Sequence, residues 1–364
     1  MNRNYFRPIQ NKNYRKEYFQ TLSNTTSIPT STPPPNPIPI FPSMLPSTSQ
    51  LYDSSFSSYV AILNMYFIQL FVYFFDNNID SLPISEALDL INTSNLLPSG
   101  AVVVNLLIYS CIHDTNTTSY GGMIVEYNAT SFIVLRGTQS TGADGPGHNC
   151  EWVMDSTEDL VTPNWIDPIK YPEVLVHYGF NQIYTISFAN SQGITIPSLR
   201  EQIYNYISLN RMNNLIITGH SLGGGICYLL AADLAANLLQ IRLNTKIYTV
   251  AGPYSGNQQF INIITSPPFS APNYTGVFAI INTADKVPET KLRLEYERIP
   301  SQLFCFTIPD DIKDAHAPST YREGLENNGS IFDKNVTVGC SSCGIDCKPT
   351  VETYTKNICP CCRK

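Results

Sequence analysis

One eight-residue stretch constrains the fold of this chain more than any other. Residues 218–225 read Thr-Gly-His-Ser-Leu-Gly-Gly-Gly and contain the pattern Gly-x-Ser-x-Gly around Ser221. The apolar run 215–218 before it predicts a strand, and the apolar run 222–240 after it predicts a helix. A sharp strand-to-helix reversal needs residues without a Cβ, and it would hold the serine hydroxyl above the sheet at a helix N-terminus. The same letters also fit a glycine-rich turn with an inert serine, so the prediction rests on the flanking elements.

A serine nucleophile needs a base, and the base needs a carboxylate that orients it. Only one histidine follows Ser221 in the chain, namely His316. Where a turn of this kind carries the nucleophile, the carboxylate and then the histidine follow it in the sequence. Asp285 comes directly after the apolar run 277–282, just beyond the carboxyl end of a predicted strand, where open α/β sheets place functional groups. We therefore predict Asp285 as the acid, with Asp310 as the second candidate.

Three other histidines are expected to have packing or structural roles. His220 adjoins the serine, and neighbouring side chains in an extended segment point to opposite sides. His177 precedes a predicted helix, and His148 lies in a glycine-rich loop. Asp233 falls inside the helix behind the serine. None of these side chains is predicted to belong to the catalytic group.

The oxygen of a tetrahedral intermediate needs preorganised hydrogen-bond donors. The backbone N–H of Leu222, directly after the serine, is one candidate. The second donor must come from another loop, and the Arg-Gly-Thr stretch 136–138 follows a predicted strand. Its glycine allows a free turn, and Thr138 offers both an N–H and a hydroxyl.

Alternating periodic segments begin near residue 100. The pattern over 101–112 is interpreted as a buried helix, while 122–127 and 131–137 predict two strands joined by a tight turn at Asn128-Ala129. The other predicted elements are a helix over 196–210, the strand and helix around Ser221, strands over 246–250 and 277–282, and a last apolar run over 303–308. Such alternation implies a mainly parallel sheet covered on both faces, so the predicted fold class is α/β.

Composition excludes some classes of protein. Of the 364 residues, 43% are hydrophobic and only 14% are charged, which supplies a sizeable core and argues against a wholly disordered chain. The net charge of −7 argues against nucleic-acid binding by general electrostatics. No apolar stretch of signal-peptide length follows the N-terminal basic residues, so we expect no cleavable signal peptide and leave the compartment open.

The run 59–75 is apolar nearly all round but contains Asn64 and Gln69. It is shorter than the ~20 apolar residues that a membrane span needs. We expect a buried or surface-docked helix, and an anchor for membrane association stays open as the alternative.

Six of the ten cysteines crowd into residues 340–362. They include two Cys-x-x-Cys pairs separated by fifteen residues, a spacing typical of zinc sites. Six cysteines also fit three disulfides, or unstructured thiols. The sequence leaves these three alternatives open.

Several stretches occur in the order seen in the class 3, or fungal-type, lipases. They are LRGT (135–138), VHYGF (176–180), TGHSLGG (218–224), YTVAGPYSGN (248–257), INTADKVP (281–288) and HAPSTY (316–321). The chain resembles this family over about residues 100–325. The resemblance implies an α/β-hydrolase fold and hydrolysis of lipid carboxylic esters, without a metal or organic cofactor. It implies Ser221, Asp285 and His316 as the triad and Thr138 as an oxyanion residue.

The resemblance also places a lid near Glu151-Trp152-Val153, within the long irregular stretch 139–173. Trp152, Val153 and Met154 would give the lid one apolar face, and Trp165 and Ile166 a second. The stretch is long for the family, and Leu135 stands where the family usually has an aromatic residue.

We divide the chain into a basic N-terminal tail (1–28), a Pro/Ser/Thr-rich linker (29–50), a lipase-like α/β-hydrolase domain (51–336) and a Cys-rich C-terminal tail (337–364). The expected function is that of a serine carboxylester hydrolase that acts on lipid esters at an interface, like a triacylglycerol lipase. The alternative is a non-catalytic lipase-like protein that anchors to a membrane or partner through its termini.

Overall fold

The computed structural model describes the chain between residues 54 and 327. Within this range the description omits 78, 80–81, 112–113, 139–153, 156, 158, 190–192, 211–213, 238–243, 266–273, 290–293, 298–301 and 307–313. The basic tail, the linker and the cysteine-rich tail therefore lie outside the described residues. So do His148, Trp152, Val153 and the second candidate acid, Asp310.

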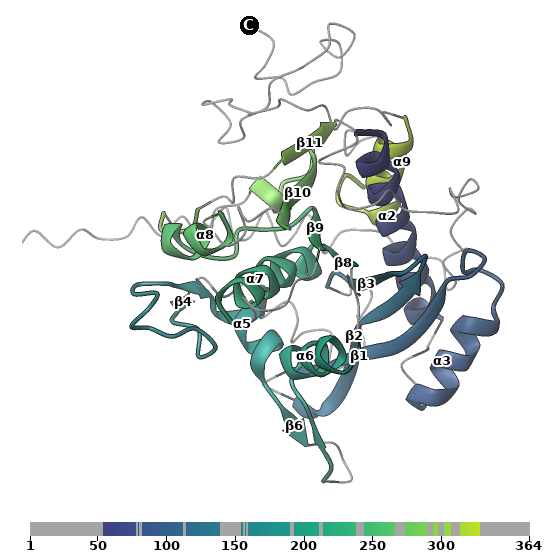
Figure 1. Ribbon diagram of the computed structural model, residues 1–364, viewed down its shortest axis with the longest axis horizontal. Helices are drawn as coiled ribbons and strands as arrows, with labels where there is room; N and C mark the ends of the chain where they lie inside the picture. Colours follow the sequence, from purple (N-terminus) through teal and green to yellow (C-terminus); the bar gives the residue numbers. More distant parts are fainter. Residues whose placement is uncertain are drawn as a thin grey trace, which may run out of the picture.

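Seven of the described strands form one large sheet with the order β1-β2-β3-β8-β9-β10-β11 (Figure 1). Its antiparallel part contains β1 (Val102–Cys111), β2 (Asp114–Tyr127) and β3 (Thr130–Leu135). Its parallel part continues from β3 through β8 (Asn214–His220), β9 (Asn244–Val250), β10 (Tyr274–Asn282) and β11 (Gln302–Phe306). This mainly parallel sheet, with the serine at a strand-to-helix turn near its centre, is the predicted α/β-hydrolase fold.

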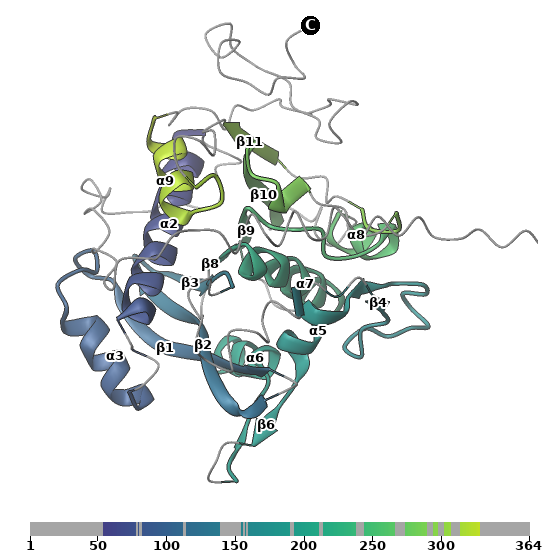
Figure 2. The ribbon, with the colours of Figure 1, turned by 180° about the vertical axis from the view of Figure 1, so that it is seen from behind.

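Helices cover both faces of the sheet, as Figures 1 and 2 show from opposite sides. One face carries α5 (Tyr178–Thr185), α6 (Leu199–Leu209), α7 (Leu222–Asn237) and α8 (Gln258–Thr265). The other face carries α2 (Ser54–Asp76), α3 (Ile84–Thr93) and α9 (Pro318–Asn327). Strand side chains alternate between these two cores because successive residues point to opposite faces. Ile217 joins the first core, for example, and Ile216 the second.

Short elements complete the description. Two small hairpins pair β4 (Leu160–Val161) with β5 (Val176–His177), and β6 (Phe188–Ala189) with β7 (Thr195–Ile196). A 3-10 helix spans Val287–Glu289. Helix α6 begins at Leu199, three residues after the predicted start at 196, because the Ser198 hydroxyl accepts the N–H of Glu201 and the Glu201 carboxylate accepts the N–H of Ser198.

Helix α2 contains the apolar run 59–75. Most of its side chains between Val60 and Phe75 are buried, and Phe67 packs edge-on against Phe132 of β3 with ring centroids 5.3 Å apart. The structure therefore has the buried helix that we expected for this run. No helix within the described residues combines the length and the apolar character needed to cross a membrane.

The predicted helix over 101–112 is wrong, because the segment forms strand β1. Val103 is 2% exposed whereas Val102 and Val104 are 47% and 37% exposed, which is the alternation of a strand with one buried face. A short apolar run cannot distinguish a buried helix from a strand by periodicity, and the β-branched valines favour the strand. The tight turn between β2 and β3 is confirmed. Asn128 and Ala129 both have positive φ (48° and 56°), as a two-residue type I′ hairpin turn requires.

Candidate active site

Ser221 lies at the turn between β8 and α7, where its φ is 54°. Residues other than glycine seldom adopt this left-handed region, so the fold holds the serine in a strained conformation. Both flanking glycines are required. A Cβ on Gly219 would lie 2.3 Å from the carbonyl oxygen of Gly223, and a Cβ on Gly223 would lie 2.4 Å from that of Arg136. The predicted reversal from strand to helix is confirmed.

Three of the predicted residues meet at this turn. Asp285 follows the carboxyl end of β10, and His316 lies just before α9. The Nδ1–H of His316 donates to Oδ2 of Asp285 at 2.7 Å, which leaves Nε2 as the acceptor for the Ser221 hydroxyl at 2.9 Å. Hydroxyl, imidazole and carboxylate therefore form one hydrogen-bonded chain.

The Asp285 carboxylate is fixed by further donors. It is 3% exposed; its Oδ2 also accepts the Tyr321 hydroxyl at 2.7 Å, and its Oδ1 accepts the N–H of Val287 at 2.9 Å. The Tyr321 oxygen in turn accepts the N–H of Asn282 at the end of β10. Sequence reasoning missed Tyr321, since only its place in the stretch 316–321 sets it apart from the other tyrosines.

The electrostatic environment favours a protonated His316. Burial lowers the pKa of its imidazole, but the charge of Asp285 and the hydrogen bond to it, with smaller contributions from Asp314 and Asp155, raise that pKa above the ordinary 6.5. Asp314 also accepts the backbone N–H of His316 at 3.0 Å. The imidazolium that would form on removal of the serine proton is therefore stabilised by three nearby carboxylates.

The other described histidines are not placed to act as bases on Ser221. His220 is 5% exposed, and its Nε2–H donates to the backbone oxygen of His316 at 2.8 Å. Burial and the nearby His316 lower the pKa of His220 well below 6.5, so it stays neutral. His177 caps α5 by accepting the N–H of Phe180, and its ring stacks on that phenylalanine at 3.9 Å. Burial lowers the pKa of His177 to about 3.

The loop after β3 borders the serine, as predicted. In the parallel register, Leu135 lies opposite Gly219, which brings Gly137 level with Ser221. A Cβ built on Gly137 would lie 3.0 Å from the Ser221 Cβ. The hydroxyl of the next residue, Thr138, donates to Oδ2 of Asp155. Leu222 is the first residue of α7, so its N–H is one of the helical donors without an intrahelical acceptor.

Part of the predicted lid is instead core. Trp165 and Ile166 are 7% and 4% exposed and belong to the cluster under α5, α6 and α7. The Trp165 indole N–H donates to Oδ1 of Asn181 at 2.9 Å. The prediction that these two residues form an apolar lid face is wrong. Trp165 packs against Tyr184 of α5, and its carbonyl oxygen accepts the Asn237 amide at 2.9 Å, at the end of α7 opposite to Ser221. The other predicted face falls largely outside the described residues, apart from Met154, which is buried.

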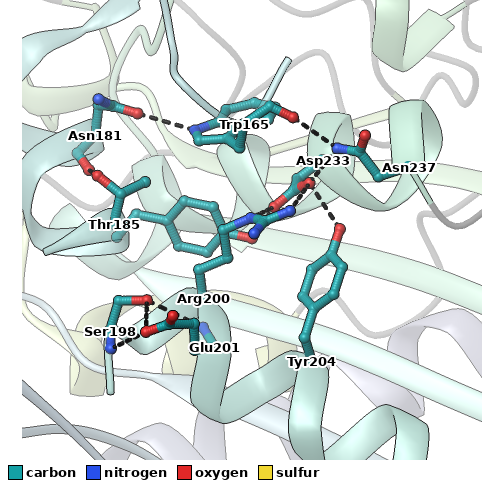
Figure 3. Close-up of polar contacts among 10 residues, drawn as sticks. Trp165, Asn181, Thr185, Ser198, Arg200, Glu201, Tyr204, Asp233 and Asn237 are labelled. Carbon is teal, nitrogen blue, oxygen red and sulfur yellow. Dashed lines mark hydrogen bonds and ion pairs between the residues drawn. The ribbon is translucent and has the colours of Figure 1, made fainter. Parts of the chain in front are cut away.

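Asp233, within α7, is the centre of a separate polar cluster (Figure 3). Its fully buried carboxylate accepts Arg200 Nε at 2.5 Å and Nη2 at 3.1 Å. It also accepts the Tyr204 and Tyr184 hydroxyls at 2.6 and 2.8 Å, and the Asn237 amide at 2.6 Å. The cluster ties α5 and α6 to α7, so Asp233 has the structural place that its position inside the helix predicts.

The arrangement around Ser221 can move a proton from a hydroxyl to an imidazole beside two candidate N–H donors. These groups are the ones that nucleophilic attack on a carbonyl carbon and stabilisation of the resulting oxyanion require. Across the part of the chain that the structure describes, no group of three or more His, Cys, Asp or Glu side chains could hold a metal ion.

The family model and the two relatives described below that match this chain are all named as lipases. A family model described as "Lipase (class 3)" matches residues 132–294. The chain is 32% identical over 124 residues to a chloroplastic galactolipase, DONGLE, of Arabidopsis thaliana, covering 31% of this chain and 26% of that protein. It is 29% identical over 159 residues to a lipase of Rhizomucor miehei, covering 43% of this chain and 36% of that lipase. The chain thus spans about a third of the length of these relatives. Among solved structures, a crystal structure of an MDLA mutant from Penicillium cyclopium shares 22% sequence identity with this chain and has a TM-score of 0.42. The match covers 72% of this chain and 82% of that one.

Proposed function

We propose that this chain, whose residues 132–294 match the class 3 lipase family model, is a serine hydrolase of lipid carboxylic esters. The observation that carries the proposal is the hydrogen-bonded chain from Ser221 through His316 to Asp285, with a strained serine at its end. The two relatives described above are named a galactolipase and a lipase, which supports lipids as the class of substrate.

The proposed reaction proceeds through an acyl-enzyme. Ser221 Oγ attacks the ester carbonyl carbon while its proton passes to His316 Nε2. The backbone N–H groups of Leu222 and Thr138 stabilise the resulting oxyanion. When the intermediate collapses, the bond to the alcohol oxygen breaks, and His316 returns the proton to the leaving alcohol. A water molecule then repeats the sequence on the acyl-Ser221 ester and releases the carboxylic acid.

Asp285 holds the imidazole in the tautomer with the proton on Nδ1 and stabilises the imidazolium. Tyr321 and the N–H of Val287 fix the carboxylate in turn, so that His316 is presented to Ser221 in one orientation. A non-catalytic role would need none of this alignment.

The test is an ester panel with the full chain. It contains short and long p-nitrophenyl esters, a triglyceride emulsion, phospholipid vesicles and galactolipid vesicles, each with Ser221→Ala as the blank. We expect hydrolysis of at least one lipid ester that is absent in Ser221→Ala. Ser187→Ala, which removes a hydroxyl bound to Glu201 away from the turn, should retain the activity. Folded protein that hydrolyses no ester above the Ser221→Ala blank would support the non-catalytic alternative.

A further inference from the structure

Arg136 is only 4% exposed, although it lies two residues before Thr138, a predicted oxyanion residue. Its guanidinium donates from three nitrogens. Nε donates to the carbonyl oxygen of Tyr120 at 2.7 Å, Nη2 to the hydroxyl of Ser119 at 2.6 Å, and Nη1 to the carbonyl oxygen of Gly137 at 2.7 Å. Two of these acceptors belong to β2 and the third to the loop beside Ser221. The planar, rigid fork of an arginine thus fixes the loop relative to the sheet.

Two aromatic rings hold the guanidinium itself. Its central carbon lies 4.4 Å from the ring centroid of Phe75, near the end of α2, and 5.6 Å from that of Tyr109 on β1. Such cation–π contacts are stronger where water is excluded, as around this buried side chain. The position of Arg136 is therefore set by α2, β1 and β2, all of which precede residue 132, where the match to the class 3 lipases begins.

The contact with the Gly137 oxygen has a consequence for the next N–H. A peptide unit is planar and trans, so its C=O and N–H point in opposite directions. The carbonyl of the Gly137–Thr138 peptide is turned inward to Arg136, and the N–H of Thr138 must therefore point away from the guanidinium. This peptide borders the serine, as the short separation between a Gly137 Cβ and the Ser221 Cβ shows. A flipped peptide would instead turn an oxygen toward the nucleophile and repel an oxyanion.

We propose that Arg136 is a positioning residue for the oxyanion hole, which holds the Gly137–Thr138 peptide in the orientation that presents the Thr138 N–H to the reacting oxygen. The inference rests on the proposed function, because an oxyanion forms only if Ser221 attacks an ester. It adds a role for α2, whose Phe75 keeps the guanidinium in place. It also predicts that the effect of Arg136 is larger in the transition state than in the substrate complex.

The experiment measures kcat and KM on a soluble p-nitrophenyl ester for the full chain and for Arg136→Met, Arg136→Lys and Phe75→Leu. It also measures inhibition by an alkyl boronic acid, whose tetrahedral adduct with Ser221 places an oxygen at the oxyanion position. For Arg136→Met we expect kcat to fall about 100-fold, the size of the loss when one oxyanion donor is removed, with KM within about twofold. Boronate affinity should fall in parallel. Arg136→Lys should lose less, and Phe75→Leu about threefold.

Arg200→Met is the matched control, since it removes a second arginine with a buried carboxylate and an aromatic ring as partners, in the Asp233 cluster (Figure 3). It should lower the melting temperature while kcat and boronate affinity stay within about twofold. Equal losses of kcat in Arg200→Met and Arg136→Met would overturn the inference. So would unchanged boronate affinity in folded Arg136→Met. If that variant does not fold, a kcat within twofold of the unaltered chain in both Arg136→Lys and Phe75→Leu overturns it. Absence of any hydrolysis that Ser221→Ala removes would instead defeat the proposed function.

Discussion

Two buried carboxylates are associated with helix α7, and their partners differ in kind. Asp233, inside the helix, is compensated by the permanent cation of Arg200 and by fixed donors from Tyr184, Tyr204 and Asn237. Asp285, linked to the N-terminal end of the helix through His316 and Ser221, is paired with an imidazole that can gain or lose a proton. A permanent ion pair can hold helices together but offers no group that changes its charge near neutral pH.

Exposure does not separate the two clusters. The carboxylates are equally hidden, with the Asp233 side chain 0% exposed and that of Asp285 2%. Their basic partners are similarly exposed, with the Arg200 side chain at 27% and that of His316 at 21%. Burial of a carboxylate therefore does not identify a reactive site. A titratable partner in contact with a strained nucleophile does.

The largest effect is expected from removing the serine nucleophile or its histidine base. Ser221→Ala and His316→Ala should each lower kcat about a million-fold, because residues that act as a unit lose most of the rate together. Steady-state hydrolysis of a soluble ester, with circular dichroism to confirm folding, measures this. The kcat of the double variant should be little lower than that of either single variant. If the two losses of kcat multiply, Ser221 and His316 do not act as a unit.

The next prediction compares the same substitution, aspartate to asparagine, at the two buried carboxylates. Asp285→Asn should lower kcat about 10⁴-fold, because the amide favours the wrong imidazole tautomer. Asp233→Asn should instead lower the free energy of unfolding by about 3 kcal/mol and should leave kcat nearly unchanged. The partly exposed Arg200 loses its counter-charge, and the buried donors around residue 233 lose their charged acceptor. Kinetics and urea unfolding on both variants give the comparison. A kinetic defect in Asp233→Asn as large as that in Asp285→Asn would erase the distinction.

A smaller effect concerns the tyrosines that bind each carboxylate. Tyr321→Phe removes a hydroxyl from Asp285, and Tyr204→Phe removes one from Asp233. A hydrogen bond to a charged group contributes about 1.5–3 kcal/mol, so we expect kcat to fall about tenfold in Tyr321→Phe. Tyr204→Phe should lower the melting temperature without changing kcat. Identical kinetics in the two variants would mean that Tyr321 does not orient Asp285.

The smallest expected effect is a displacement of the pH profile. Hydrolysis needs neutral His316, so the rate should rise with pH as the imidazole loses its proton, with a midpoint above the ordinary pKa of 6.5. Asp314→Asn keeps an oxygen acceptor for the His316 N–H but removes a negative charge. The pKa of His316 should therefore fall, and the midpoint of the kcat/KM profile should move to lower pH. Glu201→Gln removes a charge near the Asp233 cluster and should leave the midpoint in place; equal displacement in both variants would contradict the assignment.

Much of the fold and site was predictable because local patterns determine them. The run 215–240 predicts a strand, a turn and a helix. The closeness of Ser221 and Asp285 follows from how parallel strands end at one edge of a sheet, and the choice of His316 from its being the single histidine after Ser221. The strand β1 was missed because an apolar run of that length has no decisive period until its partner β2 is known. Tyr321, Asp155 and the contacts of Arg136 depend on segments far apart in sequence, which no local pattern brings together. Trp165 and Ile166 show the same limit, because only the covering helices make them core.

The most direct test is covalent labelling by a serine-reactive probe. It asks whether the probe reacts at Ser221 and whether the reaction needs His316. The full chain, Ser221→Ala, His316→Ala and Asp233→Asn are incubated with an alkyl fluorophosphonate, and the adduct is located by peptide mass spectrometry. We predict one adduct per chain on Ser221 in the unaltered protein and in Asp233→Asn, very slow labelling in His316→Ala and none in Ser221→Ala. A folded protein that remains unlabelled, or that is labelled equally well without His316, would contradict the claim that these residues form a serine nucleophile and its base.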